Sequence, residues 1–320
     1  MRGFGFAIAI IAMLLTLGSI ALDSVWFFDV LASLRVQAVI GSAVLALIAL
    51  LFRKWYAGGL LACCMLVNAA LVAMPMMVER PANAARSNDF SMLFYNSAQN
   101  TLELAPLMGF LKENKPDLLA FTEVYRWDIE NLRKLFLDYR HTIGEPGVFG
   151  AVILSKLPIS DFRVHRLAEG PSGRTLEVRL CAASPPNRCM ALLVLHPTPP
   201  LSSDFHAWRN RHILSTAELA GTIAGEASID GRVIMAGDFN VTPYNAVYRQ
   251  ALEQGGLSDA FVDRLPHSTW FSSSPVLGLA IDHVWTGRGI ATTATDIGPL
   301  SGSDHLPIMV ETTLGMKLRP

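Results

Sequence analysis

The sequence predicts a mixed α/β domain of about 230 residues that follows an apolar N-terminal segment. Two observations lead to this prediction. The chain of 320 residues has a mean hydropathy of +0.36 with only 17% charged residues, and the apolar excess lies in residues 1–78. Beyond that segment, strand-like and helix-like patterns alternate, and one pair of strand-like runs is typical of an antiparallel hairpin. The hairpin argues against a purely parallel sheet.

Three runs almost without charge, at residues 3–22, 37–52 and 58–78, dominate the N-terminal segment. A helix needs about 17 to 25 apolar residues to cross a bilayer, and the middle run is the shortest of the three. We therefore expect residues 1–78 to form a transmembrane region of about three helices, with the lipid bilayer as its partner. The alternative for the first run is a signal peptide at residues 1–21, because residues 19–21 resemble a small-residue cleavage site.

The charges around these runs predict an orientation. Arg2 precedes the first run, and Arg53 and Lys54 lie between the second and the third. By the positive-inside rule, both positions are cytoplasmic. After three spans the chain beyond Glu79 lies on the exported side. This predicts a multi-pass protein of the plasma membrane (the inner membrane of a bacterium) with a periplasmic domain, and no obligate protein partner is evident.

Two of the four cysteines bear on the same question. Cys181 and Cys189 close the Pro-rich loop CAASPPNRC between the two alternating runs of the hairpin. Cysteines at the two strand ends that flank a hairpin loop can come within disulfide range, and an oxidising compartment would let them pair. A disulfide between them is the hypothesis, and two unpaired thiols are the alternative.

The rest of the chain divides into a linker and one folded domain. Residues 79–89 are polar and aperiodic, as expected for a linker, and residues 90–315 have the composition of a globular domain. The expected strands are residues 90–96, 117–123, 147–155, 174–180, 190–196, 232–237, 281–286 and 305–311. The expected helices are residues 102–114, 126–138, 205–225 and 244–254. Thr242 is expected to cap the last helix with Pro243 in its first turn, and Arg209 to lie on a solvated helix face.

Polar side chains of only four types gather at the ends of the expected strands. Loops at strand ends bring together side chains that are distant in the sequence. The residues at these positions are Asn96, Glu123, His196, Asp238, Asn240, Asp282, Asp304 and His305. Carboxylates and carboxamides are hard oxygen ligands that suit Mg²⁺, Mn²⁺ or Ca²⁺, whereas zinc and iron sites lean on clustered Cys or His. An Asp and His pair beside such an ion can activate water, so the set indicates metal-assisted phosphoester hydrolysis.

The same residues carry a resemblance to a known family. The motifs TEV, GAVILSKLPI, GDFNVTP, IDHVW and SDHLPI occur in the order and approximate spacing of the endonuclease/exonuclease/phosphatase superfamily, which has a deoxyribonuclease I-like fold. The similar region covers residues 90–313. The resemblance implies an α+β architecture, namely a four-layer α/β/β/α sandwich of two mixed sheets with helices outside, here in a membrane-anchored bacterial member.

The resemblance also implies roles for individual residues. Glu123 is similar to the principal metal ligand, with Asn96 beside the metal or the phosphate and Asp304 supporting the metal or the neighbouring histidine. The ion implied is Mg²⁺, or alternatively Mn²⁺ or Ca²⁺.

Five further residues are implied to be catalytic. Asp238 would orient or activate the attacking water, and Asn240 would hold that water or the phosphate. His305 would contact the scissile phosphate, Asp282 would orient a histidine, and His196 would lie near the leaving group.

The expected function is therefore a membrane-anchored, divalent-metal-dependent phosphoesterase that acts on a lipid head group or a small phosphoester. A metal-dependent nuclease is the alternative, and an inactive membrane-bound scaffold is a third. Residues 81–320 carry 21 Lys and Arg against 24 Asp and Glu, a net charge of about −3. Because duplex binding relies on a basic surface, this charge argues weakly against a nucleic-acid substrate.

Overall fold

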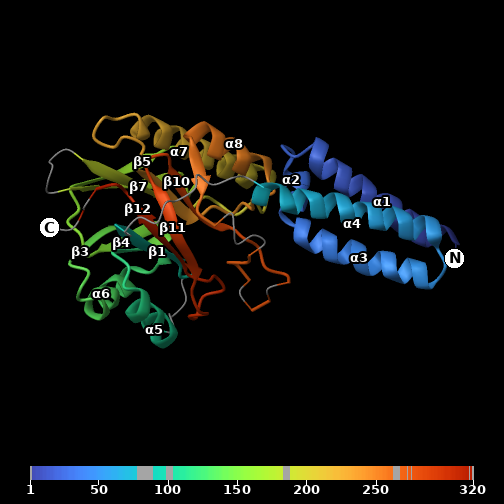
Figure 1. Ribbon diagram of the computed structural model, residues 1–320, viewed down its shortest axis with the longest axis horizontal. Coiled ribbons are helices and arrows are strands. Elements are labelled where there is room, and N and C mark those ends of the chain that lie inside the picture. The colour runs from blue at the N-terminus through green and yellow to red at the C-terminus, as the bar shows by residue number, and fades with distance from the viewer. Residues whose placement is uncertain are drawn as a thin grey trace.

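A computed structural model describes residues 2–77, 89–98, 104–182, 188–261, 267–271, 273–274, 276–316 and 318. It contains a bundle of N-terminal helices beside a two-sheet domain (Figure 1). The expected linker lies outside the described residues except for Asp89.

The N-terminal bundle consists of four α-helices and a short 3-10 turn. They are α1 (Arg2–Ala21), α2 (Trp26–Ser33), α3 (Arg35–Leu51), α4 (Trp55–Ala73) and η1 (Met74–Met77). The segment Trp55–Met77 is long and apolar enough to cross a membrane. The pair Gly5–Ala21 and Trp26–Ser33 passes the same test only as a unit that bends by 105°, and Arg35–Leu51 is shorter.

The first sheet has six strands in the order β11-β12-β1-β2-β4-β3. Their bounds are β1 (Phe90–Asn96), β2 (Leu118–Val124), β3 (His141–Glu145), β4 (Gly147–Ser155), β11 (Ala291–Ile297) and β12 (Ile308–Thr313). The central pair β1 and β2 is parallel, and the other neighbours are antiparallel. The sheet is therefore mixed.

The second sheet also has six strands, in the order β5-β6-β7-β8-β10-β9. Their bounds are β5 (Asp161–Arg166), β6 (Arg174–Cys181), β7 (Cys189–Leu195), β8 (Val233–Asp238), β9 (Leu257–Asp259) and β10 (Asp282–Gly287). Strands β7 and β8 form its parallel pair. In the antiparallel hairpin of β6 and β7, Cys181 lies opposite Cys189, and the two form a disulfide.

Helices cover the outer face of each sheet (Figure 1). They are α5 (Leu104–Asn114) and α6 (Arg126–Leu135) on the first sheet, and α7 (Ser203–Ala224) and α8 (Ala246–Gly255) on the second. Met92 of β1 packs between the sheets with Leu192 of β7, whereas Leu93 packs outward with Leu107 of α5. Burial on both faces explains why β1 is an almost unbroken apolar run. The four-layer sandwich predicted from the sequence is confirmed.

The topology brings the ends of the central strands to one edge of the sandwich. Asn96 ends β1 and Glu123 lies near the end of its parallel neighbour β2. In the other sheet, Asp238 ends β8 opposite Asp282, the first residue of antiparallel β10. His305 precedes β12, which runs antiparallel to β1. The polar residues of both sheets therefore meet at this edge.

The segment after β8 differs from its expected form. Helix α8 begins at Ala246 rather than at Pro243, and its N-cap residue is Asn245. Thr242 does not cap the helix, because its hydroxyl and its backbone N–H both donate to Asn245 Oδ1, at 2.7 and 2.9 Å. Residues 239–245 therefore form a loop between the strand and the helix, which we call the β8–α8 loop.

Candidate active site

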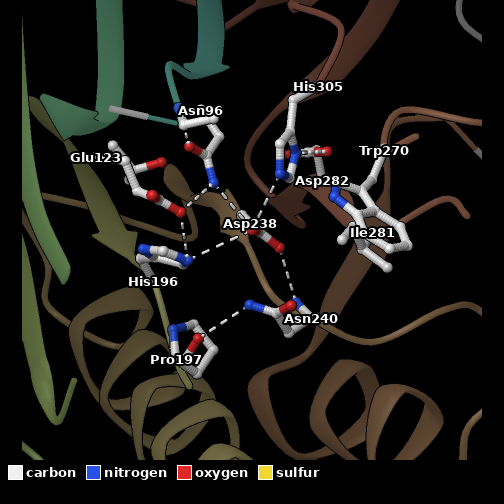
Figure 2. A network of polar contacts seen from close by, with 12 residues as sticks. Asn96, Glu123, His196, Pro197, Asp238, Asn240, Trp270, Ile281, Asp282 and His305 are labelled. Atoms are coloured by element: carbon white, nitrogen blue, oxygen red, sulfur yellow. Dashed lines mark hydrogen bonds and ion pairs between the residues drawn. The ribbon is translucent and has the colours of Figure 1, made fainter. Parts of the chain in front are cut away.

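The polar side chains at this edge form one network around Asp238 (Figure 2). Glu123 enters it from β2 with its side chain 19% exposed. Its backbone lies in the left-handed region with a φ of 55°, which is rare for a residue with a Cβ atom. Such strain is stored at functional sites when the surrounding structure holds it in place.

Asn96 joins two carboxylates. Its Nδ2 donates to Glu123 Oε1 at 3.1 Å and to Asp238 Oδ2 at 3.0 Å. Its Oδ1 accepts from the backbone N–H of Ala98 at 2.9 Å. Asn96 is thus arranged to hold the carboxylates together through its amide hydrogens, while its oxygen is engaged by the backbone.

Asp238 is 2% exposed and lies between two imidazoles. Its Oδ2 is 3.4 Å from Nε2 of His196 and 3.8 Å from Nε2 of His305. Its Oδ1 accepts from the backbone N–H of Asn240 at 2.9 Å. Burial alone would raise the pKa of Asp238, but the two histidines and this N–H outweigh burial and lower it. The carboxylate is therefore kept ionised.

His196 follows β7 and is also buried. Its Nδ1 lies 2.8 Å from the carbonyl oxygen of Val148, so Nε2 faces Glu123 at 3.6 Å as well as Asp238. Burial lowers the pKa of His196, while Asp238 and Glu123 raise it, and the net shift is upward. A cavity of about 210 Å³ lies against this histidine and is lined by β4 residues 147–151, Arg174 and Leu176.

His305 and Asp282 form the second half of the site. The Nδ1 atom of His305 is 2.8 Å from Asp282 Oδ2, and Asp282 is fully buried. Burial lowers the pKa of His305, but Asp282 and Asp238 raise it to about 9. Burial also raises the pKa of Asp282, only partly offset by His305. The other oxygen of Asp282, Oδ1, is buried with no hydrogen-bond partner in the described structure.

The two remaining predicted residues lie at the margin of the site. Asn240 donates from Nδ2 to the carbonyl oxygen of Pro197 at 3.1 Å and has a φ of 51°. Asp304 is 51% exposed, and its Oδ2 accepts from the indole nitrogen of Trp270 at 2.9 Å. Its Oδ1 is 4.0 Å from His305 Nε2. The structure thus brings seven of the eight residues together and leaves Asp304 at the solvent edge.

The donor set suits a divalent cation. One ligand atom each from Glu123, His196 and Asp238 all lie within 4.8 Å of one another, and the same holds for Asp238, Asp282 and His305. Carboxylates supply most of these atoms, which favours Mg²⁺, Mn²⁺ or Ca²⁺ over softer metals. The unpartnered Oδ1 of buried Asp282 and the strained backbone of Glu123 fit the same interpretation. The residues present therefore fit a metal ion.

One contribution to the site was missed in the sequence. Arg209 was expected on a solvated helix face, but its side chain is 0% exposed and its Nη1 donates to the carbonyl oxygen of Asn240 at 3.0 Å. Its partner is Asp29 of α2, 2.6 Å from Nη2. The expectation was wrong because α2 covers this face of α7. No local pattern signals a contact between residues 180 positions apart.

Comparisons with known proteins agree with this geometry. The family model described as endonuclease/exonuclease/phosphatase family matches residues 87–305. A search of curated proteins found no match. Many solved structures share the fold, and three of them have TM-scores of 0.53 to 0.56.

The first of these is an endonuclease/exonuclease/phosphatase from Beutenbergia cavernae, with 17% identity and a TM-score of 0.56 over 71% of this chain and 72% of that one. The second is a mannosyl-6-phosphatase from Bacteroides thetaiotaomicron, with 15% identity and a TM-score of 0.55 over 70% and 99%. The third is a 3′ phosphatase from Neisseria bound to a product DNA hairpin, with 16% identity and a TM-score of 0.53 over 70% and 99%. The family match covers more than half of the chain and includes the residues around Asp238. This chain therefore belongs to the endonuclease/exonuclease/phosphatase family.

Proposed function

We propose that the protein is a membrane-anchored, divalent-metal-dependent phosphoesterase that hydrolyses a phosphodiester or phosphomonoester of a lipid head group, or of a small molecule, on the exported side of the membrane. The observation that carries the proposal is the buried network of carboxylates and imidazoles around Asp238. Burying like charges is costly, so a set of this kind is typical of a site that holds a cation and a phosphate.

Glu123 and Asp238 are the proposed principal ligands of the ion, which is Mg²⁺ or alternatively Mn²⁺ or Ca²⁺. Asn96 holds these two carboxylates at a fixed separation through its amide. When bound, the ion would polarise a phosphoryl oxygen and stabilise the leaving oxygen. The protein contributes the preorganised frame, because every ligand comes from a strand end.

The remaining residues act on water and phosphate in this proposal. Asp238 is kept ionised and can accept a proton from the attacking water, with Asn240 fixing the loop beside it. His305 can donate from Nε2 to a phosphoryl oxygen, because Asp282 accepts from its Nδ1. His196 lies on the other side of Asp238, where it can protonate a leaving oxygen.

The helical bundle supports the membrane part of the proposal. Leu14 of α1, Leu47 of α3 and Leu66 of α4 are each about 60% exposed, at 61%, 59% and 63%. A bundle with large apolar side chains on its outer surface is unfavourable in water and favourable in lipid. We propose that α1, α3 and α4 each cross the bilayer. The disulfide between Cys181 and Cys189 supports an oxidising, exported location of the sandwich.

The direction in which the site faces supports a lipid substrate. Trp26 of α2 donates from its indole nitrogen to the carbonyl oxygen of Pro200 at 2.7 Å, and Gln37 of α3 donates to that of Gly278 at 3.0 Å. Pro200 lies in the loop that follows β7 and Gly278 in the loop that precedes β10, at the strand ends that carry His196 and Asp282. In Figure 1 the bundle lies beside the sandwich. Leu201 and Leu277 in these loops are 75% and 58% exposed. An apolar rim turned toward the bilayer suits a head group presented by a membrane.

A nuclease is the second candidate, and one observation favours it. The similar Neisseria structure is a 3′ phosphatase with a DNA product bound. The formal net charge of about −3 for residues 81–320 provides little of the counterion release on which duplex binding relies. We therefore rank the nuclease below the lipid phosphoesterase.

The experiment that separates these candidates uses the full chain reconstituted in nanodiscs. Turnover is measured on a panel of phospholipids, on a soluble phosphodiester and on plasmid DNA, with Mg²⁺, Mn²⁺ or Ca²⁺. We expect phospholipid turnover to exceed DNA cleavage. DNA cleavage without phospholipid turnover would favour the nuclease, and no turnover on any substrate would favour an inactive scaffold. Glu123→Gln, which removes one charge, is expected to weaken Mn²⁺ binding measured by calorimetry, whereas exposed Glu130→Gln is the matched control.

A further inference from the structure

An aspartate of the N-terminal bundle is buried where the bundle packs against the two-sheet domain. Asp29 of α2 is 1% exposed, and both of its carboxylate oxygens accept hydrogen bonds from that domain. Oδ2 accepts from Arg209 Nη2 at 2.6 Å, and Oδ1 accepts from Asn245 Nδ2 at 3.0 Å. Asn245 Nδ2 also donates to the backbone carbonyl oxygen of Asp29 at 2.8 Å. Asp29 is therefore held by two elements that are far from it in the sequence.

Arg209 carries this contact to the active site. Its side chain is 0% exposed, and Asp29 is the carboxylate with which it pairs in the described structure. Its Nη1 donates to the backbone carbonyl oxygen of Asn240 at 3.0 Å. The backbone N–H of the same residue donates to Asp238 Oδ1 at 2.9 Å. Asn240 thus accepts a hydrogen bond from Arg209 through its backbone carbonyl and donates one to Asp238 through its backbone N–H.

Asp29 reaches the β8–α8 loop at both of its ends. At the first end, Arg209 fixes the carbonyl of Asn240, whose left-handed φ of 51° needs outside support. At the second end, Asn245 accepts two hydrogen bonds from Thr242 with its oxygen while its Nδ2 donates to Asp29. Asp29 therefore contacts Asn245 directly and is linked to Asn240 through Arg209.

From this geometry we propose that Asp29 is a positioning residue. It links the N-terminal bundle to the β8–α8 loop, so that the orientation of the Asp238 carboxylate depends on the packing of α2 against the sandwich. The effect on turnover rests on the proposed phosphoesterase function. The hydrogen-bonded tie is independent of that function. Asp29 itself touches none of the residues proposed to meet the phosphate or the metal.

The chemistry of a carboxylate makes Asp29→Asn an informative change. Asp29 uses one oxygen for Arg209 and the other for Asn245, whereas asparagine has a single carbonyl oxygen beside an amino group. The variant therefore leaves one N–H of Arg209 or Asn245 without the acceptor that the Asp29 side chain provides, while preserving the shape of the side chain. Loss of supporting contacts of this kind typically costs about 10- to 100-fold in activity.

The matched control is Asp23→Asn. Asp23 also belongs to the bundle and also pairs with an arginine of the sandwich, Arg249, at 3.6 Å. Both side chains are partly exposed, at 34% and 57%. Arg249 donates to the carbonyl oxygens of Tyr244 and Asn245, at 3.3 and 3.4 Å, so this pair contacts the helix end of the loop, away from Asn240. The two variants remove the same charge from the same region and differ in whether the contact leads to Asn240, whose backbone N–H donates to Asp238.

The test compares the wild-type full chain, Asp29→Asn and Asp23→Asn in nanodiscs. Amide hydrogen exchange of residues 239–245 is measured together with kcat and KM on a soluble phosphodiester and with the melting temperature. We expect Asp29→Asn to speed exchange in the loop and to lower kcat by about 10- to 100-fold with KM within about threefold. Asp23→Asn should leave the exchange of residues 239–242, both kinetic constants and the melting temperature unchanged. Unchanged exchange of the loop in Asp29→Asn would overturn the proposal.

A purely structural role of Asp29 gives a different pattern. Removing the charge of Asp29 leaves the charge of Arg209 buried without a partner. If the role of Asp29 is purely structural, this lowers the melting temperature, and any loss of kcat follows from the lower stability. The double variant Asp29→Asn/Arg209→Met removes both charges at similar volume. We expect it to recover the melting temperature while kcat stays low, because the carbonyl of Asn240 still lacks its donor. Recovery of kcat together with the melting temperature would also overturn the proposal. If the wild type turns over no substrate, the proposed function fails and the exchange data still decide whether the tie exists.

Discussion

The Nδ1 atom of His305 lies 2.8 Å from Oδ2 of Asp282, a fully buried carboxylate at the start of β10 in the opposite sheet. This contact fixes the proton on Nδ1 and turns Nε2 toward Asp238, 3.8 Å away. Which imidazole nitrogen carries a proton is set by the hydrogen bond that the other one makes. The pair therefore determines what His305 can offer to a phosphate.

The first prediction tests that pair. Asp282→Asn can place its amide hydrogens against Nδ1, which disfavours the N–H on that atom and the charged imidazole. We expect kcat to fall by about 10²-fold with little change in KM, as for other positioned acid and base groups. Steady-state kinetics on a soluble phosphodiester provide the measurement. Asp230→Asn, at an exposed position, is the control, and equal kcat values for the two variants would refute the role of Asp282.

The second prediction concerns Asp238. Replacing it by asparagine removes the acceptor that lies between His196 and His305, together with one ligand charge of both candidate metal groups. Turnover should fall by about 10²-fold or more. Circular dichroism should be unchanged because the volume and the backbone contacts are preserved. A variant with near-wild-type turnover would show that the attacking water is activated elsewhere.

The third prediction concerns stability in acid. Burial, together with neighbouring His196, lowers the pKa of His212 to about 3 from its ordinary value of 6.5. Between these values the unfolded chain binds a proton that the folded chain does not, so stability falls as the pH drops below 6.5. His212 contributes up to about 1.4 kcal/mol of lost stability per pH unit in this window.

His212→Gln isolates this contribution. Glutamine can keep the hydrogen bond to Thr175 Oγ1, which lies 3.0 Å from Nε2, and does not take up a proton. Denaturant unfolding at pH 7, 6 and 5 should show a smaller loss of free energy of unfolding for the variant than for the wild type. Parallel losses in the two proteins would mean that other groups govern acid unfolding.

The fourth prediction concerns the disulfide and the side of the membrane. In native membranes, an alkylating reagent should leave Cys181 and Cys189 unmodified until the protein is reduced. Alkylation of both cysteines after reduction is the internal control for reagent access. Two alkylated thiols before reduction would contradict both the bond and the oxidising location. Because the bridge closes a short loop, Cys181→Ser with Cys189→Ser should lower the free energy of unfolding by about 2 to 3 kcal/mol.

Much of this fold follows from sequence patterns because its central strands are buried on both faces. The runs around Asn96, Glu123, Asp238 and Asp282 are apolar and end in polar residues, which makes both the strands and the site visible. The four edge strands β3, β5, β9 and β11 were not predicted. Strand β5 is mostly exposed and polar, and β9 has three residues, so neither shows a clear period.

The parts of the site that could not be predicted depend on tertiary contacts. Arg209 is solvated in a helix considered alone and is buried only because α2 packs against it. Asp29 has no local signal for the same reason. The amide of Asn96 faces two carboxylates, an arrangement set by strand pairing rather than by residue type. A sequence motif identifies which residues form a site, whereas the tertiary structure determines which of their atoms hydrogen-bond to one another.

The central claim is that phosphoester hydrolysis at Asp238 requires a divalent ion, and metal removal tests it most directly. The full chain in nanodiscs is treated with EDTA, dialysed and assayed on a soluble phosphodiester before and after addition of Mg²⁺, Mn²⁺ or Ca²⁺. We predict that turnover disappears with EDTA and returns with at least one of these ions in the wild type but not in Asp238→Asn. Turnover that persists in EDTA, or that no divalent ion restores, would contradict the account.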